Sequence, residues 1–517
     1  MKLFGIKHPE YILAFSLSLV FWVTGSQCAA IDQGSKSRFN LQPINLFRDD
    51  TDRKIKSIKV APVPRSRPEK TFEPQSRLTL EETLSIVDTH YPKLLQGHVE
   101  VSKAEGKTLE AQGAFDPVLK NINEYKRIQD ITKSGVFKNA VHNESRLELP
   151  TRSGIRLFAE VRVNPNDASS PVLQSGRSGE YSGGAIVPLM RNFIVNPERG
   201  KEQQARLGQS IAAINLNISR MNVLFEASVA YWDWINAYQK FEVAKGLLDI
   251  AVSREDFVKK QVADGDMPAL DITEAEKEIR IRRGNLVRAE RDIARAAFKL
   301  SLFLWSNRGD KPPDISEVNL VKADLTPRTL SDAEVEAGIQ KALSVRPELA
   351  SIDIQREIVN VDLKVAKNMM LPVVDLIYRQ GYDTGVDGIG NVFTGGIKMT
   401  VPVRQRKARG LIQQAKMELR KLELEEQFLK RKISIEVRDA ASELNAAFER
   451  FIQAGEEVEK ARAVEEGERK RYGLGDSSLF LVNRRERDRA EAEEKRIIVY
   501  GLYLKALAAF NTITGDI

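Results

Sequence analysis

Apolar and small side chains recur along two long stretches of the chain, at alternating steps of three and four residues. The average step of about 3.5 residues is the period of helices that supercoil around one another. No proline interrupts 198–262 or 404–472, so each stretch predicts one helix about 100 Å long, at about 1.5 Å per residue. The pattern is clearest at Val437, Ala440, Leu444, Ala447, Phe451, Ala454, Val458 and Ala461. On these helices alone, a soluble coiled-coil protein remains the alternative.

The helix after the first long stretch keeps the same period, with one exception. Arg282 stands where an apolar residue is expected on the seam between helices. The other seam positions are Ile272, Ala275, Ile279, Leu286, Ala289, Ile293, Ala296, Leu300 and Phe303. A turn marked by glycine separates this helix from the long one, so we expect the two to form a helical hairpin.

The chain contains the same arrangement twice. Pro92 and Pro347 each separate a short helix from a second helix, and the residues around them match at one constant offset. Gly265 and Gly475, each followed by aspartate, mark the hairpin turns at another constant offset. Proline and glycine in the same order indicate an internal duplication. The short helices are expected at 80–89 and 332–344, and the second helices at 93–112 and 348–368.

Each repeat is expected to hold a β region between its second helix and its helical hairpin. The first repeat spans 77–305, with its β region at about 115–190 and its hairpin at about 197–305. A linker is expected at 306–329. The second repeat spans 330–515, with its β region at about 371–403 and its hairpin at about 404–512.

The β regions alternate between apolar and polar residues as membrane strands do. Ile397, Met399, Val401 and Val403 share one face, and glycine, lysine, threonine and proline share the other. Such alternation over about 9–11 residues, with nearby aromatic residues, is typical of a transmembrane barrel. A half-buried strand of a soluble protein has the same pattern. A bilayer excludes open sheet edges, so a chain with too few strands must close its barrel with other chains.

The first β region is much longer than the second. The excess predicts an added hairpin, formed by 145–149 and 154–163 around the turn at 150–153. The sequence leaves open whether this hairpin joins the barrel or projects outside it.

The N-terminus is expected to direct the chain out of the cytoplasm. Residues 1–30 combine a short basic start, an apolar run at 12–23 and small residues before a cleavage point after Ala30, as in a secretory signal peptide. The alternative is lipidation at Cys28, although Gln27 is larger than the residue usual before a lipidated cysteine. Residues 31–76 are polar and rich in proline, which predicts a disordered or extended segment.

Composition argues against several classes of function. The 517 residues carry a net charge of +7, but 79 Lys and Arg are interleaved with 72 Asp and Glu, so no nucleic-acid partner is expected. One cysteine and four histidines leave little for a disulfide framework or a metal site. The short motifs of metalloproteases, serine hydrolases and nucleotide-binding loops do not occur. We therefore expect no catalytic, cofactor-binding or metal-binding residues, and no enzyme.

Taken together, the chain resembles the TolC-type outer-membrane efflux proteins, the outer membrane factors. The resemblance covers about 77–515 and lies in the order helix, strand pair, long helix, glycine turn and helix, twice behind a signal peptide. Its motifs are Arg346-Pro347-Glu348-Leu349, Val187-Pro188-Leu189, Val401-Pro402-Val403 and the hairpin turns 262–272 and 471–482. Each motif is short, and their repetition in order makes the resemblance specific.

The resemblance implies a fold that is mainly α with membrane β. Three protomers would form a homotrimer, with four strands each in a twelve-strand barrel among outer-membrane lipid and long helices in a periplasmic α-barrel. The expected partners are a periplasmic adaptor (membrane fusion) protein and an inner-membrane pump of the RND or ABC type. The chain would then be the passive exit duct of a tripartite efflux system. The alternatives are a type I protein-secretion duct and a periplasmic coiled-coil adaptor or scaffold.

The resemblance also assigns residues to the hairpin ends. The adaptor would touch the turns at Asp264, Gly265, Asp266, Leu474, Gly475 and Asp476. The periplasmic mouth would be narrowed at Asp271 and Glu274 of the first repeat. The matching positions of the second repeat hold Leu481 and Arg484, with Arg485 beside it, which departs from the acidic pattern of the family. We hypothesise that Asp271 or Glu274 pairs with Arg484 or Arg485 in the closed mouth.

Overall fold

A computed structural model describes residues 78–129, 135, 137–164, 175, 179–305, 327–384 and 390–516. The expected signal peptide, the segment 31–76, Cys28 and most of the linker 306–329 lie outside these residues. The described chain forms two compact units. The sheet unit comprises the described parts of Leu109–Gln204 and Val361–Ala415, and the helical unit comprises those of 78–108, Ala205–Asn360 and 416–516.

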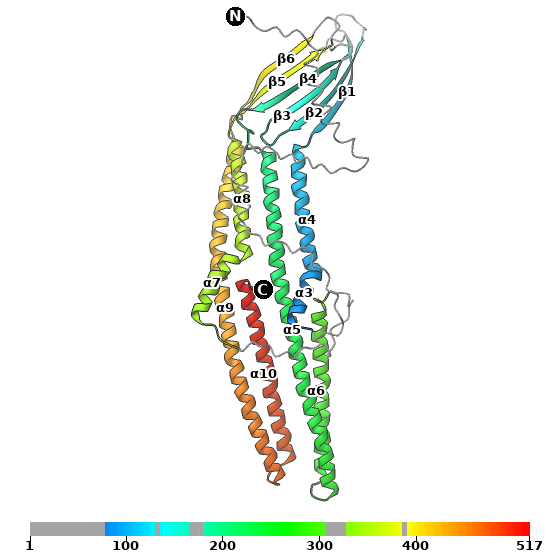
Figure 1. Ribbon diagram of the computed structural model, residues 1–517, viewed down its shortest axis with the longest axis vertical. Coiled ribbons are helices and arrows are strands. Elements are labelled where there is room, and N and C mark those ends of the chain that lie inside the picture. The colour runs from blue at the N-terminus through cyan, green and yellow to red at the C-terminus, as the bar shows by residue number, and fades with distance from the viewer. Residues whose placement is uncertain are drawn as a thin grey trace, which may run out of the picture. The chain divides into compact units, whose positions relative to one another are not determined.

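The helices occur in the order that the duplication predicts (Figure 1). The first repeat has α3 (Leu80–His90), α4 (Pro92–Gln112), α5 (Pro197–Ala263) and α6 (Leu270–Ser301). The second repeat has α7 (Asp332–Val345), α8 (Pro347–Asn368), α9 (Arg406–Gly473) and α10 (Leu479–Thr514). Both α3 and α7 start with a capping box, in which Thr79 pairs with Glu82 and Ser331 with Glu334. These reciprocal bonds satisfy backbone N–H groups that a helix start leaves without partners.

The predicted seam of α9 lies in the core of the helical unit. Val437, Leu444, Ala454 and Val458 are at most 1% exposed. The first two pack with residues of α7 and α10 in one apolar cluster. Among the described helices, α10 alone is long and apolar enough to cross a bilayer, but half of its most apolar window is buried within the protein. Its apolar character therefore serves packing against α9.

The sheet unit holds six antiparallel strands in the order of the chain. They are β1 (Val118–Gln129), β2 (Phe137–Pro150), β3 (Arg156–Val163), β4 (Glu180–Pro188), β5 (Val373–Asp383) and β6 (Asn391–Thr400). The two repeats join at β4 and β5, where Ala185 lies opposite Tyr378. The expected hairpin at 145–163 is part of this one sheet, because β3 pairs with β2 on one side and β4 on the other.

Candidate membrane face and helical hairpin ends

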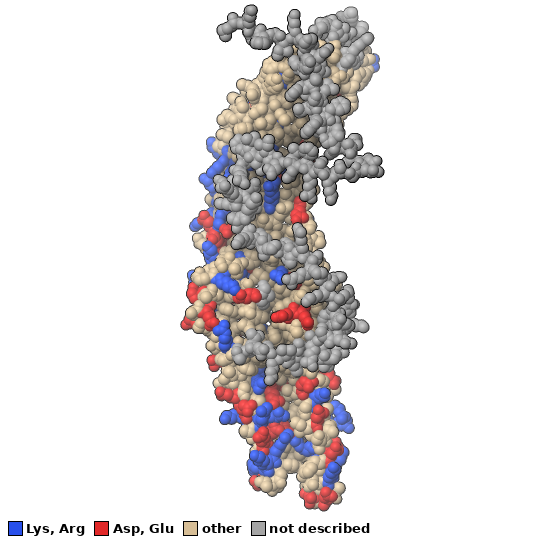
Figure 2. Space-filling model, viewed as in Figure 1, with Lys and Arg blue, Asp and Glu red and all other residues tan. Residues whose placement is uncertain are grey.

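One face of the sheet, here called the outer face, is apolar and open to the surroundings. Strand alternation and the cross-strand register assign each side chain to a face. The exposed residues of the outer face on β3 to β6 include Leu157, Val161, Tyr181, Leu376, Tyr378, Tyr382, Phe393, Ile397 and Met399. Their exposed fractions run from 36% to 70%. On the side that Figure 2 shows, the described part of the sheet is almost free of charged side chains.

The opposite face, here called the inner face, carries charged side chains that cover one another. Glu160 and Glu180 are 6% and 2% exposed, although both are acidic. Arg379 contacts Glu180 at 2.5 Å and Glu160 at 3.3 Å, and Arg162 also pairs with Glu180. Arg146 adds a further contact to Glu160, at 3.3 Å.

The two faces together invert the pattern of a water-soluble sheet, in which the apolar face is buried and the charged face is exposed. An exposed apolar face is stable where the surroundings are themselves apolar, as in the hydrocarbon of a bilayer. Exposed tyrosine and phenylalanine side chains on the same face are also typical of membrane strands. The sheet therefore has the chemistry of a barrel wall with lipid outside and a polar lining inside.

The predicted turn residues form two equivalent helix ends. Gly265 and Gly475 have φ values of +85° and +78°, which glycine adopts without strain. The N–H of the following aspartate bonds back to the helix in both turns, Asp266 to Gln261 and Asp476 to Arg471, each at 2.9 Å. These are Schellman ends, which satisfy the last carbonyl groups of α5 and α9.

The two turns lie close together in the helical unit. Val258 of α5, Ala275 of α6 and Leu479 of α10 share a small apolar cluster, with Tyr472 beside it. Outside this cluster, Leu270 is 75% exposed and Leu474 is 84% exposed. The paired turns therefore present exposed leucines together with Asp264, Asp266 and Asp476.

The structure gives Glu274, Arg484 and Arg485 partners on their own helices. Glu274 pairs with Lys277 at 3.2 Å, one turn along α6. Arg484 and Arg485 both pair with Asp488 of their own helix, at 3.5 and 3.2 Å. Within one chain, the described ion pairs thus do not include the hypothesised pairing of Asp271 or Glu274 with Arg484 or Arg485.

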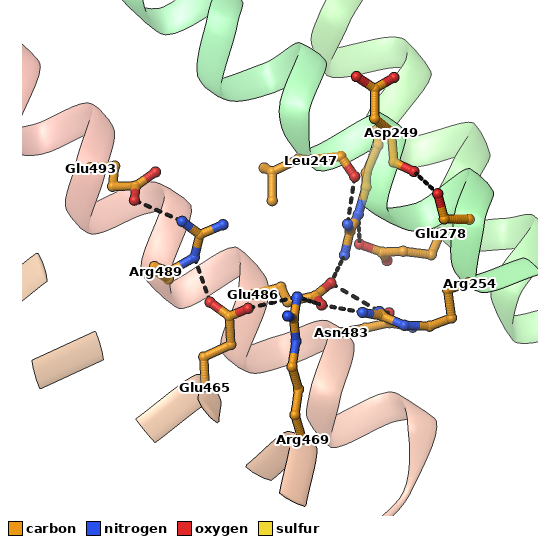
Figure 3. Close-up of polar contacts among 12 residues, drawn as sticks. Leu247, Asp249, Arg254, Glu278, Glu465, Arg469, Asn483, Glu486, Arg489 and Glu493 are labelled. Carbon is orange, nitrogen blue, oxygen red and sulfur yellow. Dashed lines mark hydrogen bonds and ion pairs between the residues drawn. The ribbon is translucent and has the colours of Figure 1, made fainter. Parts of the chain in front are cut away.

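A buried cluster around Glu486 joins the two helical hairpins instead (Figure 3). Glu486 of α10 is fully buried. It accepts hydrogen bonds from Arg254 of α5 at 2.9 Å, Arg282 of α6 at 2.8 Å and Arg469 of α9 at 2.8 Å. Arg254 also donates to Asn483 at 2.7 Å. One carboxylate therefore links all four helices that form the hairpins, and we call these five residues the Glu486 cluster.

Sequence reasoning missed this cluster, although one signal pointed to it. Arg282 interrupts the apolar seam of α6, and a charge at a seam position needs a buried partner. The structure supplies three, because the guanidinium also donates to Glu278 at 2.9 Å and to the carbonyl of Leu247 at 2.7 Å. The sequence could not identify Glu486, since it lies more than 200 positions from Arg282.

The cluster sets the protonation of its carboxylate. Burial alone would raise the pKa of Glu486, but hydrogen bonds and charge attraction from Arg254, with further hydrogen bonds from Arg282 and Arg469, lower the pKa to about 2. The carboxylate therefore stays ionised at neutral pH and holds the arginines together.

This lowered pKa predicts a pH dependence of stability. A carboxylate whose pKa falls on folding stabilises the folded state above its ordinary value of 4.5, and that contribution disappears as pH falls towards 2. We expect the difference in Tm between the wild type and Glu486→Gln to be large at pH 7 and to shrink between pH 4.5 and 2. Circular dichroism during heating, at steps of pH, measures it. A difference that stays constant over this range would contradict the assignment.

Comparison with solved structures identifies the fold. The outer-membrane channel OprN matches with a TM-score of 0.63 and 14% identity, over 87% of this chain and 98% of that one. The CmeC outer membrane channel of Campylobacter jejuni matches with a TM-score of 0.60 and 13% identity, over 87% of this chain and 94% of that one. The MtrE outer membrane channel of Neisseria gonorrhoeae has the same TM-score and identity, over 87% of this chain and 96% of that one.

No protein-family model matches the sequence, and no curated protein does either. At sequence identities this low, the solved structures show the fold alone. The fold combines long helices with a small antiparallel sheet. They agree with the resemblance found in the repeats, the strand pairs and the hairpin turns. The chain therefore has the fold of the TolC-type outer-membrane efflux channels.

Proposed function

We propose that the chain is one protomer of a passive outer-membrane exit duct that extends into the periplasm. The observation that carries this proposal is the inverted sheet, with its exposed apolar outer face and its buried, ion-paired inner face. A single such sheet leaves edges that a bilayer does not tolerate, so the barrel would close with other copies of the chain, in the homotrimer that the resemblance implies. The twelve-strand barrel that the resemblance implies rests on four strands per protomer.

The helical hairpins supply the periplasmic part of the proposed duct. Long α5, α6, α9 and α10 would continue the wall as an α-barrel, whose narrow end lies at the hairpin turns. The turns carry Leu474 and Leu270, which are exposed apolar side chains that suit docking to a periplasmic adaptor. An inner-membrane pump of the RND or ABC type would drive transport, because the duct itself has no proposed catalytic residues.

The mouth of the duct would be held closed by the Glu486 cluster within each protomer. Asp271, Glu274, Arg484 and Arg485 would line the opening and meet residues of the neighbouring protomers. Opening would then require the two hairpins of a protomer to separate. The buried charges make this costly, because each would lose its partner.

Two alternative functions differ from this proposal in testable ways. A type I protein-secretion duct has the same architecture, and only its cargo would differ. A periplasmic coiled-coil adaptor or scaffold would use the helices without a membrane barrel. The outer face argues against the scaffold, since it would expose apolar side chains to water on four strands.

Separation of inner and outer membranes on a density gradient tests the proposal. We expect the mature chain in the outer-membrane fraction, as a trimer on gels of unheated samples and a monomer after heating. Recovery in the soluble periplasmic fraction would overturn the duct and favour the scaffold. Co-purification with a secreted polypeptide, and not with a small-molecule pump, would favour the secretion duct.

A further inference from the structure

We propose that each protomer contributes six strands to the barrel, so that β1 of one copy pairs with β6 of the next and the trimer closes as an eighteen-strand barrel. This inference rests on the proposed function and replaces its four strands per protomer by six. It identifies the surface by which protomers join in the membrane. Because barrel diameter grows roughly linearly with strand number, the pore would be about one and a half times as wide as with twelve strands.

A four-strand sheet of β3 to β6 would leave out β1 and β2, here called the added strands, but the sheet continues into them without interruption. The pairing of β2 with β3 runs from Asn143 opposite Val163 to Pro150 opposite Arg156. The pairing of β1 with β2 then covers the full length of β1, from Val118 to Gln129. Neither the register nor the antiparallel order breaks between β3 and the added strands, as it would if β1 and β2 projected from the wall.

The added strands also continue the ion pairs of the inner face. On the inner face, Lys120 contacts Glu148 at 2.6 Å, and Arg146 contacts Glu148 at 3.0 Å. Since Arg146 also reaches Glu160 of β3, the ion pairs of the inner face extend across β1, β2 and β3. If β1 and β2 lay outside the barrel, we would not expect their side chains to form ion pairs with the inner face of β3.

The outer face of β1 and β2 carries one charge among its described side chains, at Arg127. The guanidinium of Arg127 lies 4.3 Å from the ring of Phe137, at the strand ends remote from α4. Leu119 and Tyr125 on the same face are 72% and 65% exposed. Asparagines lie between them, and Asn121 donates to Ser145 at 2.7 Å, which gives one N–H of the amide a partner within the sheet.

The turn between β2 and β3 is fastened to the base of the sheet unit. Arg152 makes two hydrogen bonds to Glu202 of α5, at 2.8 and 3.0 Å, and the carboxylate is buried. The N–H of Ile194 donates to the carbonyl of Ser153 at 3.0 Å. Gly154 has φ of +88°, and a Cβ there would overlap the carbonyl oxygen of Asn192. The turn that joins β2 to β3 is thus held in place at the base of the sheet.

The two edge strands of the sheet, β1 and β6, are suited to pair with each other. Within the described residues, β1 pairs only with β2, and β6 pairs only with β5. Their lengths are 12 and 10 residues, which is enough to cross a bilayer at the usual tilt. Six alternating strands make β1 and β6 run in opposite directions, so the joint between copies is antiparallel like the rest. A second copy of this chain therefore fits both edges.

Disulfide cross-linking between paired strands tests the joint. Asn123→Cys on β1 is combined in turn with Phe393→Cys, Gly395→Cys and Ile397→Cys on β6, all on the outer face. A second series replaces Asn123→Cys by Val161→Cys on β3, the strand that would meet β6 if β1 and β2 lay outside the barrel. The pair Asn121→Cys and Ser145→Cys is the positive control, because these side chains already touch within one chain. Single-cysteine variants control for native Cys28.

The test is run on outer-membrane fractions under mild oxidation. We expect the β1–β6 series to give bands at two and three times the protomer mass, and the β3–β6 series to give none. Adducts from β3 and β6, or no adducts between chains while the control pair oxidises in an intact trimer, would overturn the six-strand joint and leave the duct standing. Absence of the trimer from the outer membrane would overturn both proposals.

Discussion

Replacing Glu486 with glutamine is expected to open the periplasmic mouth. The variant keeps the shape of the side chain but leaves Arg254, Arg282 and Arg469 facing one another without a counter-charge. Removing one partner of a buried ion pair costs about 3–5 kcal/mol, and here the loss falls on the contacts that join the two hairpins. We therefore expect several-fold higher conductance of the reconstituted channel and a lower Tm.

The matched control is Glu491→Gln, which makes the same chemical change on an exposed position of α10. It should leave conductance and Tm near the wild-type values. If Glu486→Gln fails to assemble, Arg469→Gln offers a milder change, because Arg469 is 44% exposed and two arginines remain on Glu486. Unchanged conductance in an intact trimer of both variants would contradict the role of the cluster.

Replacing Ile397 with arginine is expected to block assembly in the membrane. Ile397 lies on the outer face of β6 and is 70% exposed. Arginine facing lipid near the bilayer midplane costs about 2–4 kcal/mol, and a trimer would bear this cost three times. We expect the amount of trimer in the outer-membrane fraction to fall at least tenfold. The trimer band of an unheated sample, divided by the protomer band of the same sample after heating, measures it.

The adjacent Gly396→Arg is the control for this change. Gly396 lies on the inner face of the same strand, and a Cβ there meets no heavy atom within 4 Å. The arginine would point into the polar lining, so the trimer should accumulate as in the wild type. Equal loss with both variants would mean that the two faces are not distinguished by lipid, which would falsify the barrel.

The helical part of the fold could be predicted closely from the sequence, because its period is long and repeated. The seam of α9 at Val437, Leu444, Ala454 and Val458 is buried as the spacing predicts. The glycine turns also have the expected left-handed geometry. Their proposed role in adaptor docking stays a prediction, as does the lining of the mouth by Asp271, Glu274, Arg484 and Arg485.

The sheet was harder to predict, for a physical reason. Strand β1 places Asn121 and Asn123 on its outer face, where alternation relies on apolar residues. The strand is therefore recognised only through its pairing with β2, which a single sequence does not display. The Glu486 cluster was missed in the same way, because long-range ion pairs leave no spacing pattern along the chain.

The paired charges of the inner face bear on how well a barrel wall of this kind could discriminate between solutes by their charge. Its acidic groups, Glu160 and Glu180, are shared among Arg146, Arg162 and Arg379, so opposite charges cancel over a few ångströms. The field of such a mosaic decays quickly towards the pore axis, where a solute meets mainly water. A lining of this kind distinguishes weakly between cationic, anionic and neutral solutes. Any choice of cargo would then be made before the solute reaches the sheet.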